Sequence, residues 1–181
     1  FTNGLLNFEP QGYLTWYYNA AYTTRWVQSY AATGSNGDMF NVMGATGGQG
    51  GMTVEVLKSA REVSYLLDNM DPAEAAKYQY IKHMFSPILV YLGMFDTDMY
   101  GDMPYTEAVM ARYTNPMLLT PKFDTMEELY TIWYDQLVEA VNVLSNPVTV
   151  NGTQITQTAL GAQDFVYGGN AAKWAKFANS L

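Results

Sequence analysis

The stretch Asp96-Thr97-Asp98-Met99-Tyr100-Gly101-Asp102-Met103-Pro104-Tyr105-Thr106-Glu107-Ala108 decides the fold of this chain. It concentrates acidic and aromatic residues, a glycine and a proline between two long helical patterns. We predict an ordered connection in which the preceding helix ends at Gly93 to Phe95 and Tyr100-Gly101 forms a sharp turn. Met103-Pro104-Tyr105 then runs extended, because the residue before a proline avoids the helical region.

The same stretch has part of the spacing of a calcium-binding loop. Four carboxylates would fall at positions 1, 3, 7 and 12 of an EF-hand: Asp96, Asp98, Asp102 and Glu107. Tyr100 at position 5 supplies no carboxylate, and Pro104 at position 9 suits a turn better than a loop that wraps an ion. The sequence therefore predicts no metal site, with calcium at these four carboxylates as the alternative.

Composition indicates a folded domain with a surplus of rings. The chain of 181 residues is 49% hydrophobic and only 14% charged, which argues against disorder and predicts one domain. It contains 15 Tyr, 8 Phe and 4 Trp, more than a core of this size requires. Rings in excess indicate a surface that recognises sugars, peptides or proteins, and the alternative is an aromatic-rich core.

Charge and cysteine content exclude several classes of function. A net charge of -8 leaves no basic surface to neutralise phosphates, so we predict no nucleic-acid partner. The absence of cysteine excludes disulfides and cysteine-based catalysis or metal sites. The sequence has no apolar run of transmembrane length and no charged leader followed by an apolar stretch.

Helical periodicity dominates the chain. We predict helices over 12–33, over 53–70 with Thr53 as its cap, and from Asp71-Pro72 to about Leu92, with a glycine-rich loop over 44–51. A connection of one or two residues joins the second and third of these helices, so they must pack as an antiparallel hairpin. Such hairpins are the unit of tetratricopeptide-like stacks.

The second half continues this pattern. Asp124-Thr125-Met126-Glu127 predicts a capping box that opens a helix to about Leu144, after an irregular segment over 112–122. Asn151-Gly152 lies between short β-branched runs over 148–158 and predicts a small hairpin. Trp174, Phe177, Ala178 and Leu181 share one face of a last helix that has no stop signal, so we expect the fold to continue. The fold class is thus mainly α, a tetratricopeptide-like helix-hairpin superhelix with long loops and a small β-hairpin.

Three phrases give the chain a resemblance to a known family. Residues 98–108, Asp-Met-Tyr-Gly-Asp-Met-Pro-Tyr-Thr-Glu-Ala, resemble the D-x-Y-G-D-[IVM]-P-Y-[ST]-E-A signature of the SusD/RagB family. Residues 121–130 resemble its P-K-[FY]-D-T-x-E-E-[IL]-Y phrase. Residues 164–181 resemble its D-x-x-Y-x-G-D-x-x-K-W-x-K-F-A-N-S-L segment, with Asn170 in place of the usual Asp. The resemblance runs from about Phe8 to Leu181, so residues 1–181 are expected to form the N-terminal part of a single SusD-like domain.

The resemblance implies a cell-surface function. Members are bacterial outer-membrane lipoproteins that capture glycans or peptides and cover a SusC-like TonB-dependent transporter. The resemblance therefore implies an oligosaccharide or peptide ligand, that transporter as partner, and a lipid anchor on a cysteine upstream of this sequence. It implies no cofactor.

The signature phrases are scaffold motifs, so candidate ligand-binding residues come from residue chemistry. Asp38, Phe40 and Asn41 place a ring for stacking on a sugar beside polar groups for its hydroxyls. The lesser candidates are Arg25, Tyr100 and Arg112. For each residue, ordinary loop or packing duty is the alternative.

Two other classes of function compete with nutrient capture. The carboxylates of the 96–108 stretch could hydrolyse glycosides, but they lie in one loop, and the single histidine, His83, falls within a predicted helix. We therefore predict that the protein is not an enzyme. The remaining alternative is an adaptor that binds peptides in the groove of a tetratricopeptide-like stack.

Overall fold

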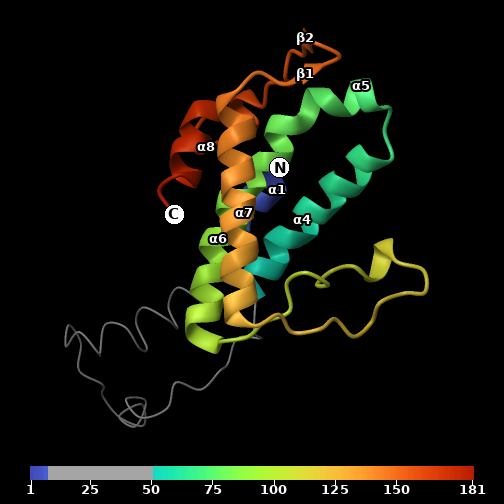
Figure 1. Ribbon diagram of the computed structural model, residues 1–181, viewed down its shortest axis with the longest axis vertical. Coiled ribbons are helices and arrows are strands. Elements are labelled where there is room, and N and C mark those ends of the chain that lie inside the picture. Colours follow the sequence, from blue (N-terminus) through green and yellow to red (C-terminus); the bar gives the residue numbers. More distant parts are fainter. Residues whose placement is uncertain (8–50) are drawn as a thin grey trace, which may run out of the picture. The chain divides into compact units, whose positions relative to one another are not determined.

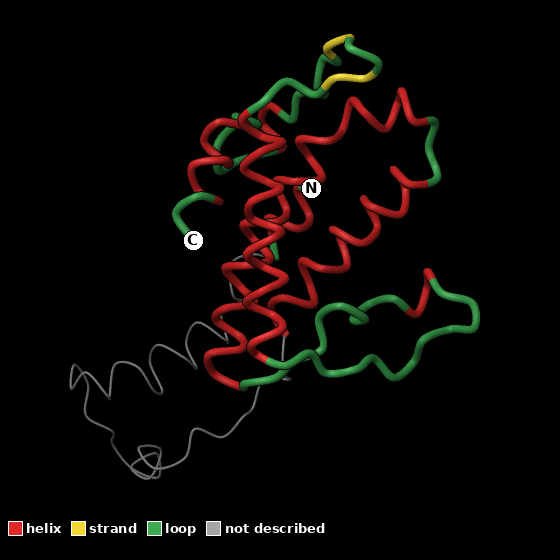
Figure 2. Tube along the Cα trace, viewed as in Figure 1, coloured by secondary structure: helices red, strands yellow, loops and turns green. Residues whose placement is uncertain are grey.

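The computed structural model describes residues 1–7 and 51–181. The predicted helix over 12–33 and nearly all of the glycine-rich loop lie outside the described residues. Within them the chain is mostly helical, with one two-stranded antiparallel sheet, as predicted (Figures 1 and 2). The elements are α1 (Thr2–Leu6), α4 (Gly51–Asp68), α5 (Pro72–Ala75), η3 (Ala76–Tyr78), α6 (Gln79–Tyr100), η4 (Ala111–Tyr113), α7 (Met126–Ser145), β1 (Thr149–Val150), β2 (Thr153–Gln154), η5 (Gly161–Gln163) and α8 (Ala171–Ala178).

Helix α6 is the centre of the described fold. It packs against α4, α7 and α8, and Figure 1 shows α6 and α7 side by side with opposite directions. Phe85 and Ile88 of α6 are buried in one core with Trp133 of α7 and Trp174 of α8. Phe1 closes this core with edge-on ring contacts to Phe85 and Trp174, at centroid distances of 5.2 and 5.8 Å. No helix in the described residues has the length and hydropathy to cross a membrane.

The start of α4 differs from the prediction. The helix begins at Gly51, so Thr53 lies inside its first turn rather than capping it. The Thr53 N–H and hydroxyl both donate to Asp96 Oδ2, at 3.1 and 2.6 Å. A carboxylate of α6 therefore satisfies an N–H group that a cap residue of the same helix would normally satisfy.

The next helix begins as predicted but is not continuous. Asp71 caps α5 by accepting the N–H groups of Ala73 and Glu74, and Pro72 takes the first helical position. The Glu74 carboxylate bonds Lys77 at 2.6 Å. The chain then turns through η3 before α6, as Figure 1 shows. The expected single helix from Asp71 to Leu92 is thus divided into α5, η3 and α6.

The predicted end of this helix at Gly93 to Phe95 is wrong, because α6 continues to Tyr100. Gly101, at φ 77°, ends it in a conformation that glycine adopts readily. Gly93 is buried against α7, where a Cβ atom would overlap the indole of Trp133. The glycine that resembled a stop signal is instead what allows α6 and α7 to approach closely.

Helix α7 is capped one residue later than predicted. The N-cap is Thr125, and its capping-box partner is Glu128 rather than Glu127. The Glu128 carboxylate accepts the Thr125 N–H at 2.8 Å, and the Glu128 N–H donates to the Thr125 hydroxyl at 3.3 Å. Asp124 is thereby free for another function, described below.

The predicted small hairpin is present. Strands β1 and β2 pair through Thr149 with Gln154 and Val150 with Thr153. Asn151 and Gly152, at φ 50° and 79°, supply the two left-handed residues of a type I′ turn. Beyond the hairpin, α8 buries Trp174 and Ala178 as its periodicity predicts, but the helix ends at Ala178, and Leu181 beyond it is 38% exposed.

Candidate functional site

Asp124, which lies just before α7, fixes the 103–108 segment through hydrogen bonds. Met103 and Asp124 form an antiparallel bridge, with N–H to carbonyl distances of 3.2 and 3.0 Å. The Asp124 carboxylate also accepts the N–H groups of Tyr105 (3.0 Å) and Thr106 (2.7 Å) and the Thr106 hydroxyl (2.7 Å). Asp124 is fully buried, so this contact fixes the path of the signature phrase.

The charge of Asp124 is stabilised by these donors. Burial alone would raise the pKa of its carboxyl, but the hydrogen bonds from Thr106, Lys122 and Tyr105 lower it below its usual value. The Lys122 ammonium lies 3.0 Å from Oδ1 on an exposed side chain. Asp124 is therefore an ionised, structural carboxylate.

The carboxylates of the calcium alternative each have a partner of their own. Asp96 is buried and bonds Thr53, while Asp98, two residues along the same helix, accepts the Tyr130 hydroxyl at 3.0 Å. Asp102 accepts the Met126 N–H at 3.0 Å, and Glu107 accepts the Lys122 N–H at 2.8 Å. Over the part of the chain that the structure describes, no group of three His, Cys, Asp or Glu residues could hold a metal ion. The loop that would have gathered these four carboxylates is replaced at its start by helix.

The candidate ligand residues fall into two groups. Arg25, Asp38, Phe40 and Asn41 lie outside the described residues. Tyr100 is the half-buried last residue of α6, and Arg112 is an exposed residue of η4. Arg112 pairs with Glu62 at 2.8 Å and lies 5.8 Å from the centroid of the Tyr113 ring. The participation of all six in ligand binding stays a prediction.

A second buried carboxylate orders the segment before α8. Asp164 accepts the N–H groups of Val166, Tyr167 and Gly169 at 3.0, 3.1 and 2.8 Å. It also accepts the indole N–H of Trp174 at 2.7 Å. The phrase over 164–181 is thus a turn tied to its own helix. Like Asp124, this carboxylate supports the scaffold.

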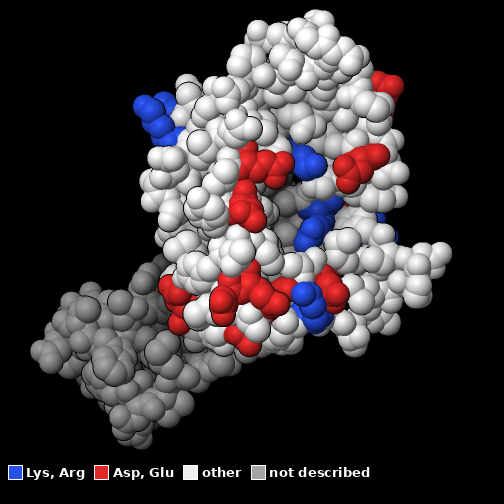
Figure 3. All heavy atoms as spheres, viewed as in Figure 1, with Lys and Arg blue, Asp and Glu red and all other residues white. Residues whose placement is uncertain are grey.

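A polar cleft of about 180 Å³ opens between α4, α6 and α7. Figure 3 shows the hollow, with Lys and Arg side chains inside it and acidic side chains on α7 at its edge. The polar residues that line it are Arg61, Ser64, Lys82, His83, Ser86, Tyr105, Gln136 and Glu139. Apart from His83, and Tyr105 as part of the signature phrase, none of these was singled out from the sequence, because they come from three separate helices.

Burial sets the protonation states in this cleft. His83 is buried, and burial is the main reason that its pKa is lowered; Lys82 acts in the same direction and Glu139 opposes it. The Glu139 carboxylate lies 4.0 Å from His83 Nε2 on a largely exposed side chain. Burial raises the pKa of Tyr105 to about 12, and its hydroxyl donates to Gln136 at 2.8 Å. His83 and Tyr105 are therefore both neutral near pH 7.

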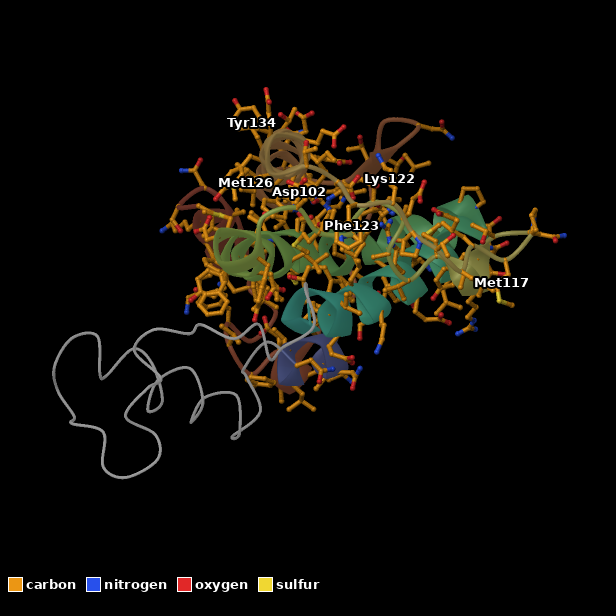
Figure 4. All side chains as sticks on the ribbon, turned by 90° about the horizontal axis from the view of Figure 1, so that it is seen from below. Asp102, Met117, Lys122, Phe123, Met126 and Tyr134 are labelled. Atoms are coloured by element: carbon orange, nitrogen blue, oxygen red, sulfur yellow. The ribbon has the colours of Figure 1, made fainter. Side chains whose placement is uncertain are left out.

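Exposed apolar side chains are spread over the described surface. Met117, Phe123 and Tyr134 are 62%, 55% and 69% exposed. Figure 4 shows Met117 at the far end of the 110–123 loop, well separated from Met126 and Tyr134 on α7. The large rings divide between such positions and the core, where Phe85, Tyr105, Trp133 and Trp174 are buried. Part of the aromatic surplus is thus available for contact.

The described architecture defines a class of protein. Helices α4 to α8 form antiparallel helix pairs around a shared core, with a β-hairpin between α7 and α8. This is a tetratricopeptide-like helical fold, as the sequence predicts.

Comparison with known proteins identifies the family. The SusD-like family model, described as "starch-binding associating with outer membrane", matches residues 19–181. The chain therefore belongs to the SusD/RagB family. It is also similar to the crystal structure of a SusD/RagB family protein from Bacteroides thetaiotaomicron VPI-5482, with a TM-score of 0.50 and 26% sequence identity. No curated protein matches the chain.

The structural match covers 70% of this chain and 23% of the Bacteroides protein. The chain thus spans about a quarter of the length of that relative. The family is described by binding and by association with the outer membrane, and its description names no reaction.

Proposed function

We propose that this chain is the N-terminal part of a cell-surface lipoprotein that captures an oligosaccharide. The captured glycan passes to a SusC-like TonB-dependent transporter in the outer membrane. The observation that carries this proposal is the family match over residues 19–181, a family described as starch-binding and associated with the outer membrane. As the resemblance implies, a lipid on a cysteine upstream of this sequence anchors the protein.

The proposed ligand contacts centre on Phe40. Its ring offers a flat apolar face for a sugar ring, and Asp38 and Asn41 beside it offer acceptors and donors for hydroxyls. All three lie within the residues that the family model matches. Arg25, Tyr100 and Arg112 are proposed as supporting contacts.

Calorimetric titration of the purified protein with starch-derived oligosaccharides tests the capture step. We expect saturable binding that Phe40→Ala weakens by about 5- to 150-fold, because loss of one stacking ring costs about 1–3 kcal/mol and about 1.4 kcal/mol corresponds to tenfold. The matched control is Phe165→Ala, which removes a ring that is 59% exposed in the 164–170 turn. Binding of peptides without glycans would replace this proposal with peptide capture.

Co-purification from outer membranes tests the delivery step. The tagged protein should retain a TonB-dependent transporter after mild detergent extraction. If it retains no such barrel and binds no glycan, it is an adaptor of the tetratricopeptide type rather than a capture protein.

A further inference from the structure

Half of the lysine and arginine side chains in the described residues have no ion-pair partner there. The other four form ion pairs with carboxylates: Lys58, Lys77, Arg112 and Lys122. Arg61, Lys82, Lys173 and Lys176 have no ion-pair partner among residues 1–7 and 51–181. Two of these four, Arg61 and Lys82, line the same cleft between α4, α6 and α7. This is an unusual place for unpaired charge in a protein of net charge -8.

Arg61 is held in place but not neutralised. One of its terminal nitrogens donates to the carbonyl oxygens of Tyr105 and Thr106 at 3.2 and 2.9 Å. Its Nε–H is buried and has no hydrogen-bond partner among the described residues. A half-buried guanidinium without a counter-ion and with an unused buried donor is costly, and a carboxylate would satisfy both needs through paired hydrogen bonds.

The other residues of the cleft suit a small polar ligand. Lys82 carries a second unpaired cation, and the hydroxyls of Ser64 and Ser86 and the amide of Gln136 add neutral polar groups. Among the described residues, the one acid that lines it is Glu139, whose side chain is 67% exposed. A volume of about 180 Å³ is close to the roughly 150 Å³ of an engineered cavity that admits benzene, so it accepts one ring but not a chain of sugars.

We propose that this cleft binds a small carboxylate of about the size of one ring, with Arg61 and Lys82 as its counter-charges. The guanidinium fixes the orientation of the carboxylate, and the ammonium adds a second positive charge. A sugar acid and the carboxyl end of a peptide both carry this chemistry. The site uses described residues only and does not depend on the proposed capture of neutral glycan at Phe40.

Calorimetry with three probes tests the carboxylate requirement in the purified protein. Glucuronate carries a carboxylate on a sugar ring, N-acetylglycine carries the carboxyl end of a peptide, and glucose is a neutral ring. We expect saturable binding of at least one carboxylate and none of glucose. The carboxylate that binds identifies the source. Failure of both carboxylates, or equal binding of glucose, overturns the proposal.

Paired lysine variants test the location. Lys82→Gln should weaken binding of the carboxylate about tenfold. A hydrogen bond to a charged group contributes about 1.5–3 kcal/mol, and screening by solvent in the open cleft reduces this contribution toward its lower end. Lys173→Gln removes an exposed, unpaired lysine from α8 and should leave the dissociation constant within twofold. Equal losses in the two variants would show a general charge effect and refute a site in the cleft.

Arg61→Lys supplies a second readout. It keeps a positive charge but cannot form the paired contact, so binding should fall even where the melting temperature is preserved. Unchanged binding in a folded Arg61→Lys protein would contradict the assigned role of the guanidinium. If this variant does not fold, the Lys82→Gln comparison still decides the proposal.

Discussion

Replacement of Asp124 by alanine should strongly destabilise the protein. The change removes the acceptor of two N–H groups, those of buried Tyr105 and half-buried Thr106, together with that of the Thr106 hydroxyl. Each backbone donor left unsatisfied costs about 1–3 kcal/mol, with the lower end for half-buried Thr106 because water reaches it, so with the lost hydroxyl contact the total is about 3–5 kcal/mol. Total stabilities are about 5–15 kcal/mol, so this is a large share.

Thermal and urea unfolding followed by circular dichroism measures the effect. A loss of this size lowers the melting temperature by roughly 6–20 °C for a domain of this length. Asp135→Ala is the matched control, because Asp135 lies on the exposed face of α7 and makes no hydrogen bond or ion pair within the described residues; it should change stability by less than about 0.5 kcal/mol. Lys122→Met removes only the exposed ion-pair partner of Asp124, so its melting temperature should stay close to that of the parent protein.

The pH dependence of Asp124→Ala follows from the lowered pKa of Asp124 in the folded state. A carboxyl with a lowered pKa stabilises the fold fully above its unfolded pKa of about 4, and this stabilisation is lost as the pH falls through the folded pKa. The stability difference between the parent and Asp124→Ala should therefore shrink below about pH 4. Equal stabilities of Asp124→Ala and Asp135→Ala at pH 7 would refute the assignment of Asp124 as the residue that holds the signature phrase.

Three further changes test other parts of the structure. Asp164→Asn should cost about 2–4 kcal/mol in urea unfolding, because one amide oxygen cannot replace the carboxylate that accepts four N–H groups; a loss below 1 kcal/mol would contradict this. Gly93→Ala should destabilise by about 1–3 kcal/mol despite the better helix propensity of alanine, since its Cβ would overlap buried Trp133; a stabilised variant would show that α6 and α7 separate easily. His83→Gln should flatten the dependence of stability on pH below about 6.5. Burial lowers the pKa of His83 in the folded state; Lys82 also lowers it, and Glu139 partly opposes this. A histidine with a lowered pKa stabilises the fold above its unfolded pKa, and this stabilisation is lost as the pH falls. An unchanged slope would mean that His83 titrates equally in both states.

The sequence predicted those turns and helix ends that are determined by residues within the turn or helix itself. Asn151-Gly152 specified the hairpin because both residues accept positive φ, and Asp71-Pro72 specified the start of α5. Helical periodicity also predicted α7, in which Leu129, Trp133 and Ala140 are buried.

Features that depend on partners far away in the sequence were missed. Asp124 resembled a helix cap, and only the position of the 103–106 backbone shows why it is buried. Gly93 resembled a stop signal because the sequence does not show that Trp133 lies against it. The cleft combines Arg61, Lys82 and Gln136 from three helices, and no spacing in the chain connects them. The prediction succeeded where a residue acts on its own turn and failed where a carboxylate or glycine acts on another helix.

The central claim is capture of a glycan, and tryptophan fluorescence of the purified protein tests it most directly. Trp133 and Trp174 are buried in the described core, so they supply a steady background, while Trp16 and Trp26 lie in the same 8–50 region as the proposed contact Phe40. Titration with starch-derived oligosaccharides should give a saturable change whose midpoint moves to higher ligand concentration in Phe40→Ala and is unchanged in Phe165→Ala. A response to peptides alone, or to no ligand in either class, would contradict glycan capture.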